Sequence, residues 1–298
     1  MVTQFLNNSK EIIYHIPVLR DEVMKYLEPG RGGNFIDATS GRGGHSSLIR
    51  ERLGHPGHLL CLDRDPENIS FLKEALGDEG IYFVQADYRT LATRGKLLGW
   101  SGAAGIFFDL GVGSFQLDDE KRGFSFRFSS PLDMRYDTNQ SLTAADVVNT
   151  LSADELADIF RNLGEEHRAR RIAAAIAEHR PLATTRDLAE LVSRVSPRHG
   201  RLHPATKVFQ ALRIFVNREL ESLEEGLKAA FDFLNPGGRL VVISYHSLED
   251  RRVKIFFREK KSAGRALLLT SKVVRPGFEE RRNNPRSRSA RLRALEKI

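Results

Sequence analysis

The chain has 298 residues, of which 41% are hydrophobic and 29% charged, a balance typical of a soluble globular protein with a sizeable core and about two domains. No apolar run is long enough to span a membrane, and the first ten residues lack a signal-peptide pattern, so we expect neither membrane insertion nor secretion. The single cysteine, Cys61, excludes an intramolecular disulfide and a cysteine-based metal cluster, and it fits a reducing, cytoplasmic location.

The first part of the sequence alternates strand and helix patterns. Short apolar runs predict strands at 34–37, 58–63, 82–85 and 105–109, and amphipathic segments predict helices at 46–53, 66–76 and 88–98. Strands that alternate with helices are typical of βαβ units, which assemble into a parallel sheet. The sequence therefore predicts an α/β fold.

A glycine-rich turn joins the first predicted strand to the first predicted helix. Gly41, Gly43 and Gly44 leave room for a ligand against the backbone, and Asp63, twenty residues after Gly43, is placed to hold the two hydroxyls of a ribose. An ordinary tight turn is the alternative interpretation. Ser46 replaces the third glycine of a dinucleotide fingerprint and no phosphate-binding loop is present, so the pattern favours a nucleoside without a diphosphate, such as S-adenosylmethionine.

Acidic residues stand at or just after the end of each predicted strand. Asp37, Asp63 and Asp109 end their strands, and Asp87 follows the third strand. Because ligands of open α/β sheets bind outside the carboxyl ends of the strands, we expect these four acids to gather around one crevice. Each acid alone is also explained as a helix N-cap.

The middle of the chain, from about residue 142 to residue 225, is wholly helical in pattern. Ser152 and Glu155 form a capping-box signature, and helical spacing continues through 165–179, 185–195 and 205–233. We interpret this region as a second domain inserted into the first. Its basic side chains are candidate RNA contacts, and a solvated helix face explains them equally well. They are Arg168, Arg170, Arg171, Arg194, Arg198 and Arg201.

A Pro-Gly-Gly turn at 236–238 starts a further predicted strand at 239–244. This strand delivers four residues to the sheet edge at which the four acids are expected: Ser244, Tyr245, His246 and Ser247. Polar and aromatic groups therefore meet the expected cofactor there.

The net charge of +7 is concentrated at the C-terminus. Residues 251–298 hold 16 Lys or Arg against 4 Glu, whereas acidic residues are in excess over residues 1–250. We interpret 251–298 as a basic tail with a mobile Arg-rich stretch at 281–288, which attracts RNA or DNA through its phosphates. A solvated tail that only aids solubility is the alternative.

Seven sequence blocks, in order over nearly the whole chain, resemble the bacterial small-subunit ribosomal RNA cytosine-N4 methyltransferase family, also called MraW. The blocks are HIPVL at 15–19, DATSGRGGH at 37–45, LGVGSFQLD at 110–118, RGFSF at 122–126, PLDMR at 131–135, HPAT at 203–206 and SYHSLEDR at 244–251. The chain departs from the family pattern at Ala38, Tyr88 and Gly113, where Gly, Phe and Ser are usual.

The resemblance implies an α/β fold of the class I (Rossmann-like) S-adenosylmethionine-dependent methyltransferases, with an inserted all-helical domain. It implies a methyltransferase domain at 1–120 and 214–298 and a helical RNA-recognition domain at 121–213. The implied cofactor is S-adenosylmethionine, and the implied substrate is a cytosine in the decoding centre (P site) of 16S rRNA within the small ribosomal subunit. By the motif match, the cofactor contacts are Gly43, Gly44, His45, Asp63, Tyr88, Asp109 and Gln116.

Methylation of an exocyclic amine is a direct displacement on a sulfonium, so it needs alignment and a group that accepts the amine N–H, and neither a metal nor a covalent intermediate. Asp109 and His246 are the candidate acceptors, and Tyr245 is a candidate for stacking on a flipped cytosine. A structural role explains His246 equally well. Methylation at C5 would need a nucleophilic cysteine, whereas Cys61 within an apolar strand is better explained as a core residue.

Two other classes of function stay open. A catalytically silent RNA-binding or ribosome-assembly factor would use the basic residues without needing the glycine-rich turn or Asp63. An NAD-dependent oxidoreductase is disfavoured by the missing third glycine and by the basic C-terminus. The sequence gives no oligomeric state, and a homodimer stays open.

Overall fold

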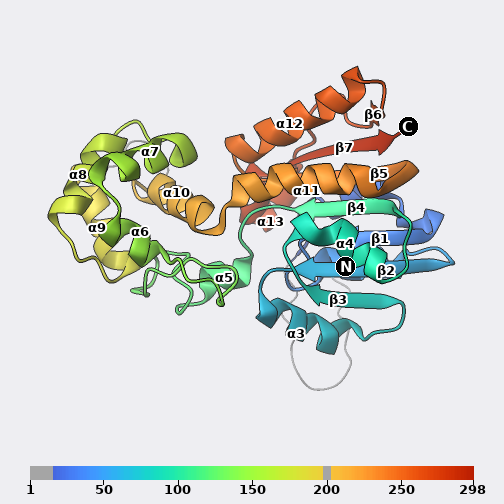
Figure 1. Ribbon diagram of the computed structural model, residues 1–298, viewed down its shortest axis with the longest axis horizontal. Helices are drawn as coiled ribbons and strands as arrows, with labels where there is room; N and C mark the ends of the chain where they lie inside the picture. Colours follow the sequence, from blue (N-terminus) through green and yellow to red (C-terminus); the bar gives the residue numbers. More distant parts are fainter. Residues whose placement is uncertain (1–15, 197–202) are drawn as a thin grey trace.

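The computed structural model describes residues 16–196 and 203–298. Figure 1 shows two bodies side by side: a sheet covered by helices on both faces, and a smaller body made of helices alone. Among the described residues, no helix is both long and apolar enough to cross a membrane.

The described residues form a seven-stranded sheet in the order β3-β2-β1-β4-β5-β7-β6. Neighbouring strands from β3 to β5 run parallel, and β7 is antiparallel to both β5 and β6. The strands are β1 (Gly33–Asp37), β2 (Gly57–Asp63), β3 (Ile81–Gln85), β4 (Ala103–Asp109), β5 (Leu234–Ser244), β6 (Ala266–Leu268) and β7 (Arg291–Lys297). The predicted α/β fold and the five strands predicted for it are confirmed, each beginning one to five residues earlier than expected.

Neighbouring residues of each strand point to opposite sides of the sheet. Because both sides carry apolar residues, helices cover both faces. Phe35 and Phe107 belong to one core, with α1, α2 and α3, and Ile36 and Phe108 belong to the other, with α4, α11 and α12. The helices of this body are α1 (Arg20–Leu27), α2 (Gly44–Glu51), α3 (Pro66–Leu76), α4 (Leu91–Leu97), α11 (Glu219–Phe233), α12 (Ser247–Ser262) and α13 (Phe278–Asn283).

The smaller body has a hydrophobic core of its own, drawn from residues 124–216. Leu156, Ile172 and Leu212 are fully buried in it. The capping box at Ser152 is present, since its side chain accepts the N–H of Glu155 at the start of α7. The helices between β4 and α11 are α5 (Ser114–Asp118), α6 (Ala144–Thr150), α7 (Ala153–Gly164), α8 (Ala169–Glu178), α9 (Thr185–Val195) and α10 (Thr206–Asn217).

The long helical pattern at 205–233 is two helices, not one. Arg218 takes a left-handed conformation with φ of 49° and separates α10 from α11. Asn217 holds the break, because its side chain donates to the Met134 carbonyl (2.7 Å) and accepts the Tyr136 N–H (2.8 Å). This junction lies between the two bodies (Figure 1).

The segment at 251–298 is basic, but the prediction that it is a tail with a mobile stretch at 281–288 is wrong. The segment folds into α12, β6, α13 and β7, and β7 pairs with β5 along six residues from Arg239 to Ser244. Leu292, Ala294 and Leu295 of β7 are fully buried. The prediction failed because arginines alternate with the buried residues of β7, and because the strands that pair with β7 are distant in sequence.

Candidate active site at the carboxyl edge of the sheet

The glycine-rich turn leads from β1 into α2. Gly43 caps α2 with φ of 82°, and a Cβ there would come within 2.5 Å of the Leu72 side chain. Gly41 also has positive φ, 52°, but a Cβ there would meet nothing within 4 Å. The turn is thus closely packed on its inner side at Gly43 and open on its outer side at Gly41, as a site that receives a ligand against the backbone requires.

Asp63 ends β2 beneath this turn. Its carboxylate accepts the N–H groups of Gly41 and Asp65, each at 2.8 Å. Burial raises the pKa of Asp63, and these backbone donors counter the effect. Asp63 therefore fixes the turn and still has acceptor positions for a hydroxyl pair.

Asp37 is fully buried behind the turn. It accepts the Ser46 hydroxyl (2.6 Å) and the Thr39 N–H (3.2 Å), so it ties β1 to the first turn of α2. Burial raises the pKa of Asp37 to about 6. The N-cap of α2 is Gly43, so Asp37 is not a helix cap.

Asp109, at the end of β4, is the meeting point of the site. The Tyr245 hydroxyl donates to Oδ1 at 2.8 Å, and Nδ1 of His45 lies 3.4 Å from Oδ2. The Asp109 side chain keeps 25% of its surface exposed, whereas that of His45 keeps 7%. A carboxylate held from two sides and still open to solvent suits acceptance of a proton or a hydrogen bond from a ligand.

His45 faces acceptor oxygens with both ring nitrogens. Nε2 donates to the Val18 carbonyl at 2.9 Å, and Nδ1 faces Asp109. Only the imidazolium satisfies both acceptors. Burial alone lowers the pKa of His45. Asp109, Asp37 and the Val18 carbonyl raise it by more, so the pKa of His45 lies above its usual value. The His45 side chain is thus committed inside the protein.

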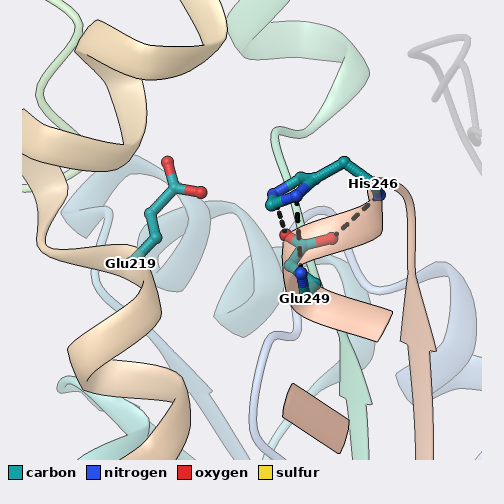
Figure 2. Close-up of side chains that lie close together, drawn as sticks. All are labelled: Glu219, His246 and Glu249. Atoms are coloured by element: carbon teal, nitrogen blue, oxygen red, sulfur yellow. Dashed lines mark hydrogen bonds and ion pairs between the residues drawn. The ribbon is translucent and has the colours of Figure 1, made fainter. Parts of the chain in front are cut away.

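His246 begins α12 and is held by Glu249 (Figure 2). Nε2 lies 3.0 Å from Glu249 Oε1, and Nδ1 accepts the Glu249 N–H at 3.4 Å. Burial alone raises the pKa of Glu249. His246, Arg213 and the Tyr245 N–H lower it by more, so the pKa of Glu249 lies below its usual value. Nε2 makes no hydrogen bond within the described part of the chain, but the His246 side chain keeps only 11% of its surface exposed, against 25% for Asp109, so His246 is less available to a ligand.

Glu219, His246 and Glu249 offer ligand atoms within 4.8 Å of one another, a spacing that would fit a metal ion. Arg213, however, binds both carboxylate oxygens of Glu219, at 2.8 and 3.0 Å. Glu249 Oε2 accepts two backbone N–H groups. Arg213 already neutralises Glu219, the two N–H groups already occupy Oε2 of Glu249, and a cation beside the Arg213 guanidinium would be repelled.

The remaining predicted residues also lie at this edge. Tyr88 packs edge-on against Phe108 at 5.3 Å and lies beside Gly226 of α11. Gln116 is buried and accepts the Gly113 N–H (3.1 Å) while donating to Asp65 (3.0 Å). Asp87 caps the 3-10 helix Tyr88–Thr90, which agrees with the alternative interpretation for that acid.

Arg122 and Asp65 were missed by sequence reasoning. Both are buried and their side chains pair at 2.8 Å. Arg122 also donates to the carbonyls of Arg135 and Tyr136, at 2.9 and 3.0 Å. This pair joins the strand end that carries Asp63 to the helical body. The only signal in the sequence was that Arg122 stands within a block shared with the MraW family.

The residues present fit S-adenosylmethionine. The open space over Gly41 gives a ligand access to the backbone, and Asp63 lies beneath it with free acceptor positions. The first N–H groups of α2 suit a carboxylate, because the start of a helix carries unpaired donors.

A family model described as the MraW methylase family matches residues 12–298. The chain is 51% identical over 290 residues to "Ribosomal RNA small subunit methyltransferase H" of Cyanothece sp., which covers 95% of each chain. It is 47% identical over 306 residues to the protein of that name from Thermomicrobium roseum, covering 95% of this chain and 94% of the other. It is 46% identical over 321 residues to that of Syntrophotalea carbinolica, covering 97% of this chain and all of the other.

Proposed function

The chain belongs to the MraW methylase family, and on that premise we propose that it methylates N4 of a cytosine in the decoding centre (P site) of 16S rRNA within the small ribosomal subunit. That the protein is an rRNA methyltransferase follows from its family and its relatives. Its cofactor is S-adenosylmethionine, which supplies a methyl group on a sulfonium. The observation that supports methylation at N4 is the position of the Asp109 carboxylate, which Tyr245 and His45 hold at the open edge of the sheet.

We assign the cofactor contacts to residues of this edge. Asp63 would hold the ribose hydroxyls, and the backbone of Gly43, Gly44 and His45 at the start of α2 would face the methionine carboxylate. Tyr88 and Gln116 complete the proposed set. Both support it indirectly, since Tyr88 packs against the strand that carries Asp109 and Gln116 holds Asp65 beside Asp63.

We assign Asp109 as the acceptor for the cytosine amine. An acceptor that hydrogen-bonds one N–H localises the lone pair on N4, and after the new C–N bond forms the nitrogen must lose a proton. Tyr245 would orient the carboxylate and offer its ring to a flipped base. His246 is the weaker candidate for the acceptor, because its side chain is more buried than that of Asp109 and its Nδ1 already accepts the Glu249 N–H.

We propose that residues 121–213, whose helices surround a separate core, recognise the RNA, with residues 1–120 and 214–298 as the methyltransferase domain. A cytoplasmic location would follow from this substrate. A homodimer stays a prediction.

Asp63→Asn separates the methyltransferase from a silent RNA-binding or assembly factor. This change keeps an acceptor for the Gly41 N–H but removes the charge offered to the ribose, so we expect S-adenosylmethionine affinity to fall at least about tenfold. RNA binding should be unchanged. The matched control is Asp78→Asn, at an exposed acid after α3.

The two activities are read by calorimetry with S-adenosylmethionine and by filter binding of small-subunit RNA. RNA binding without any cofactor binding by the wild-type protein would favour the assembly factor. NAD binding in place of S-adenosylmethionine would favour the oxidoreductase.

A further inference from the structure

A basic hollow of about 530 Å³ lies where α7 meets α8 in the helical body. Among the residues that the structure describes, its lining is basic throughout and holds no acid: Arg161, His167, Arg168, Arg170 and Arg171. All of these but Arg168 have exposed side chains. Such a concentration of positive charge in a recess attracts anions.

The local fold forces these side chains together. Ala169 and Ile172 of α8 are buried in the helical core, so the intervening Arg170 and Arg171 are left on the outer side of the helix. The first turn of α8 holds no acidic residue. Positive charges at the start of a helix oppose its dipole, so the unliganded protein bears an unfavourable interaction that a bound anion would relieve.

The acids nearest in sequence are already engaged. Glu166 is buried and accepts the Arg168 N–H at 2.9 Å. Asp158 pairs with Arg161 at 3.1 Å. The Glu165 carboxylate points to the other body, where it accepts the Ser247 hydroxyl and lies 3.5 Å from Arg251. Over residues 16–196 and 203–298, Arg170 and Arg171 have no ion-pair partner.

The hollow stands close to the catalytic edge. Glu165 follows the last residue of α7 and contacts Ser247, the first residue of α12 and the neighbour of His246. Arg161 lies four residues earlier on α7, about 6 Å along the helix axis. An RNA strand that presents its target base at Asp109 therefore has neighbouring nucleotides within reach of the hollow.

We propose that this hollow binds phosphodiester groups of the RNA strand beside the target nucleotide, an inference that rests on the proposed function. Guanidinium groups suit this ligand, because each offers several N–H donors in a planar fork that matches phosphate oxygens. Contacts of this kind position the RNA without reading its sequence. They set the affinity for RNA and leave the methyl transfer itself unaffected.

The test is the full-length double variant Arg170→Gln with Arg171→Gln. We expect its affinity for small-subunit RNA to fall about tenfold at 0.1 M salt, and the slope of log affinity against log salt to decrease in magnitude by about 1.4, which corresponds to two lost phosphate contacts. KM for RNA should rise, with kcat at saturating RNA and the affinity for S-adenosylmethionine unchanged. Restoring both charges as lysine should recover most of the salt dependence.

The matched control is Lys73→Gln with Lys96→Gln, which removes two exposed charges from α3 and α4 of the sheet body. The proposal is overturned if the double variant of the hollow has the same RNA affinity, and the same slope of log affinity against log salt, as this control. The salt dependence of binding needs no methyl transfer. Wild-type protein that binds RNA through the hollow but methylates nothing would therefore overturn the proposed function and leave this inference standing.

Discussion

At the scale of the residue, the chemistry depends on how three side chains from distant segments meet. Asp109 is the last residue of β4, His45 lies in α2, and Tyr245 directly follows β5. Burial raises the pKa of the Tyr245 hydroxyl well above its usual value, so at neutral pH this group is a donor to Asp109. The carboxylate is therefore held in one orientation before any substrate arrives.

Tyr245→Phe tests that arrangement. The ring stays and the hydrogen bond to Asp109 is lost, so we expect kcat to fall about tenfold or more with KM for RNA little changed. Single-turnover methyl transfer measures the effect, with Tyr82→Phe on β3 as the control. A rise in KM at constant kcat would instead show that the hydroxyl serves only in binding.

Asp37→Asn tests the buried acid behind the glycine-rich turn. The folded-state pKa is raised from 3.8 to about 6, so the stability contributed by this group is present below pH 3.8 and is lost as pH rises through 6. Between pH 4.5 and 7.5, the free energy of unfolding of the wild type should therefore fall by about 2 kcal/mol relative to the variant. Urea unfolding across this range measures the difference, and parallel pH profiles would contradict the assignment.

The sequence placed these residues at one edge but did not predict their partners. Strand ends and the glycine-rich turn were readable from spacing, because the parallel sheet brings the carboxyl ends together. The pairing of His246 with Glu249 and of Gln116 with Asp65 depends on side-chain directions in the folded chain. No spacing rule distinguishes a side chain that faces a ligand from one that faces the protein.

At the scale of the element, the helices with a clear apolar period were predicted well. The structure has α3 at Pro66–Leu76 and α9 at Thr185–Val195, with the predicted bounds. The C-terminal segment was not predicted well. Its strand β7 is stabilised by contacts with β5 and β6, which are distant in sequence, and its arginines alternate with the residues that it buries.

Leu295→Ala tests whether β7 is part of the core. Leu295 is fully buried between helix and sheet, and truncating such a side chain costs about 2–5 kcal/mol. Urea unfolding should show this loss, whereas Leu267→Ala on the exposed side of β6 should cost far less. Equal stability of the two variants would mean that the C-terminal segment does not fold onto the sheet.

At the scale of the whole molecule, the helical body and the sheet meet around the proposed acceptor. Arg122 and Glu165 bridge the two bodies through their side chains, and Asn217 does so through its carbonyl, which accepts a hydrogen bond from Arg64. The sequence predicted an inserted helical region but not this junction. Its residues stand in loops and at helix ends, where hydrophobic periodicity gives no signal.

The most direct measurement is mass spectrometry of the RNA nucleosides after purified protein is incubated with labelled S-adenosylmethionine and small ribosomal subunits that lack the modification. We expect labelled N4-methylcytidine at one decoding-centre cytosine, strongly reduced with Tyr245→Phe. Label on another base, on C5 of cytosine, or on no nucleoside although both ligands bind would contradict the proposed N4 methylation.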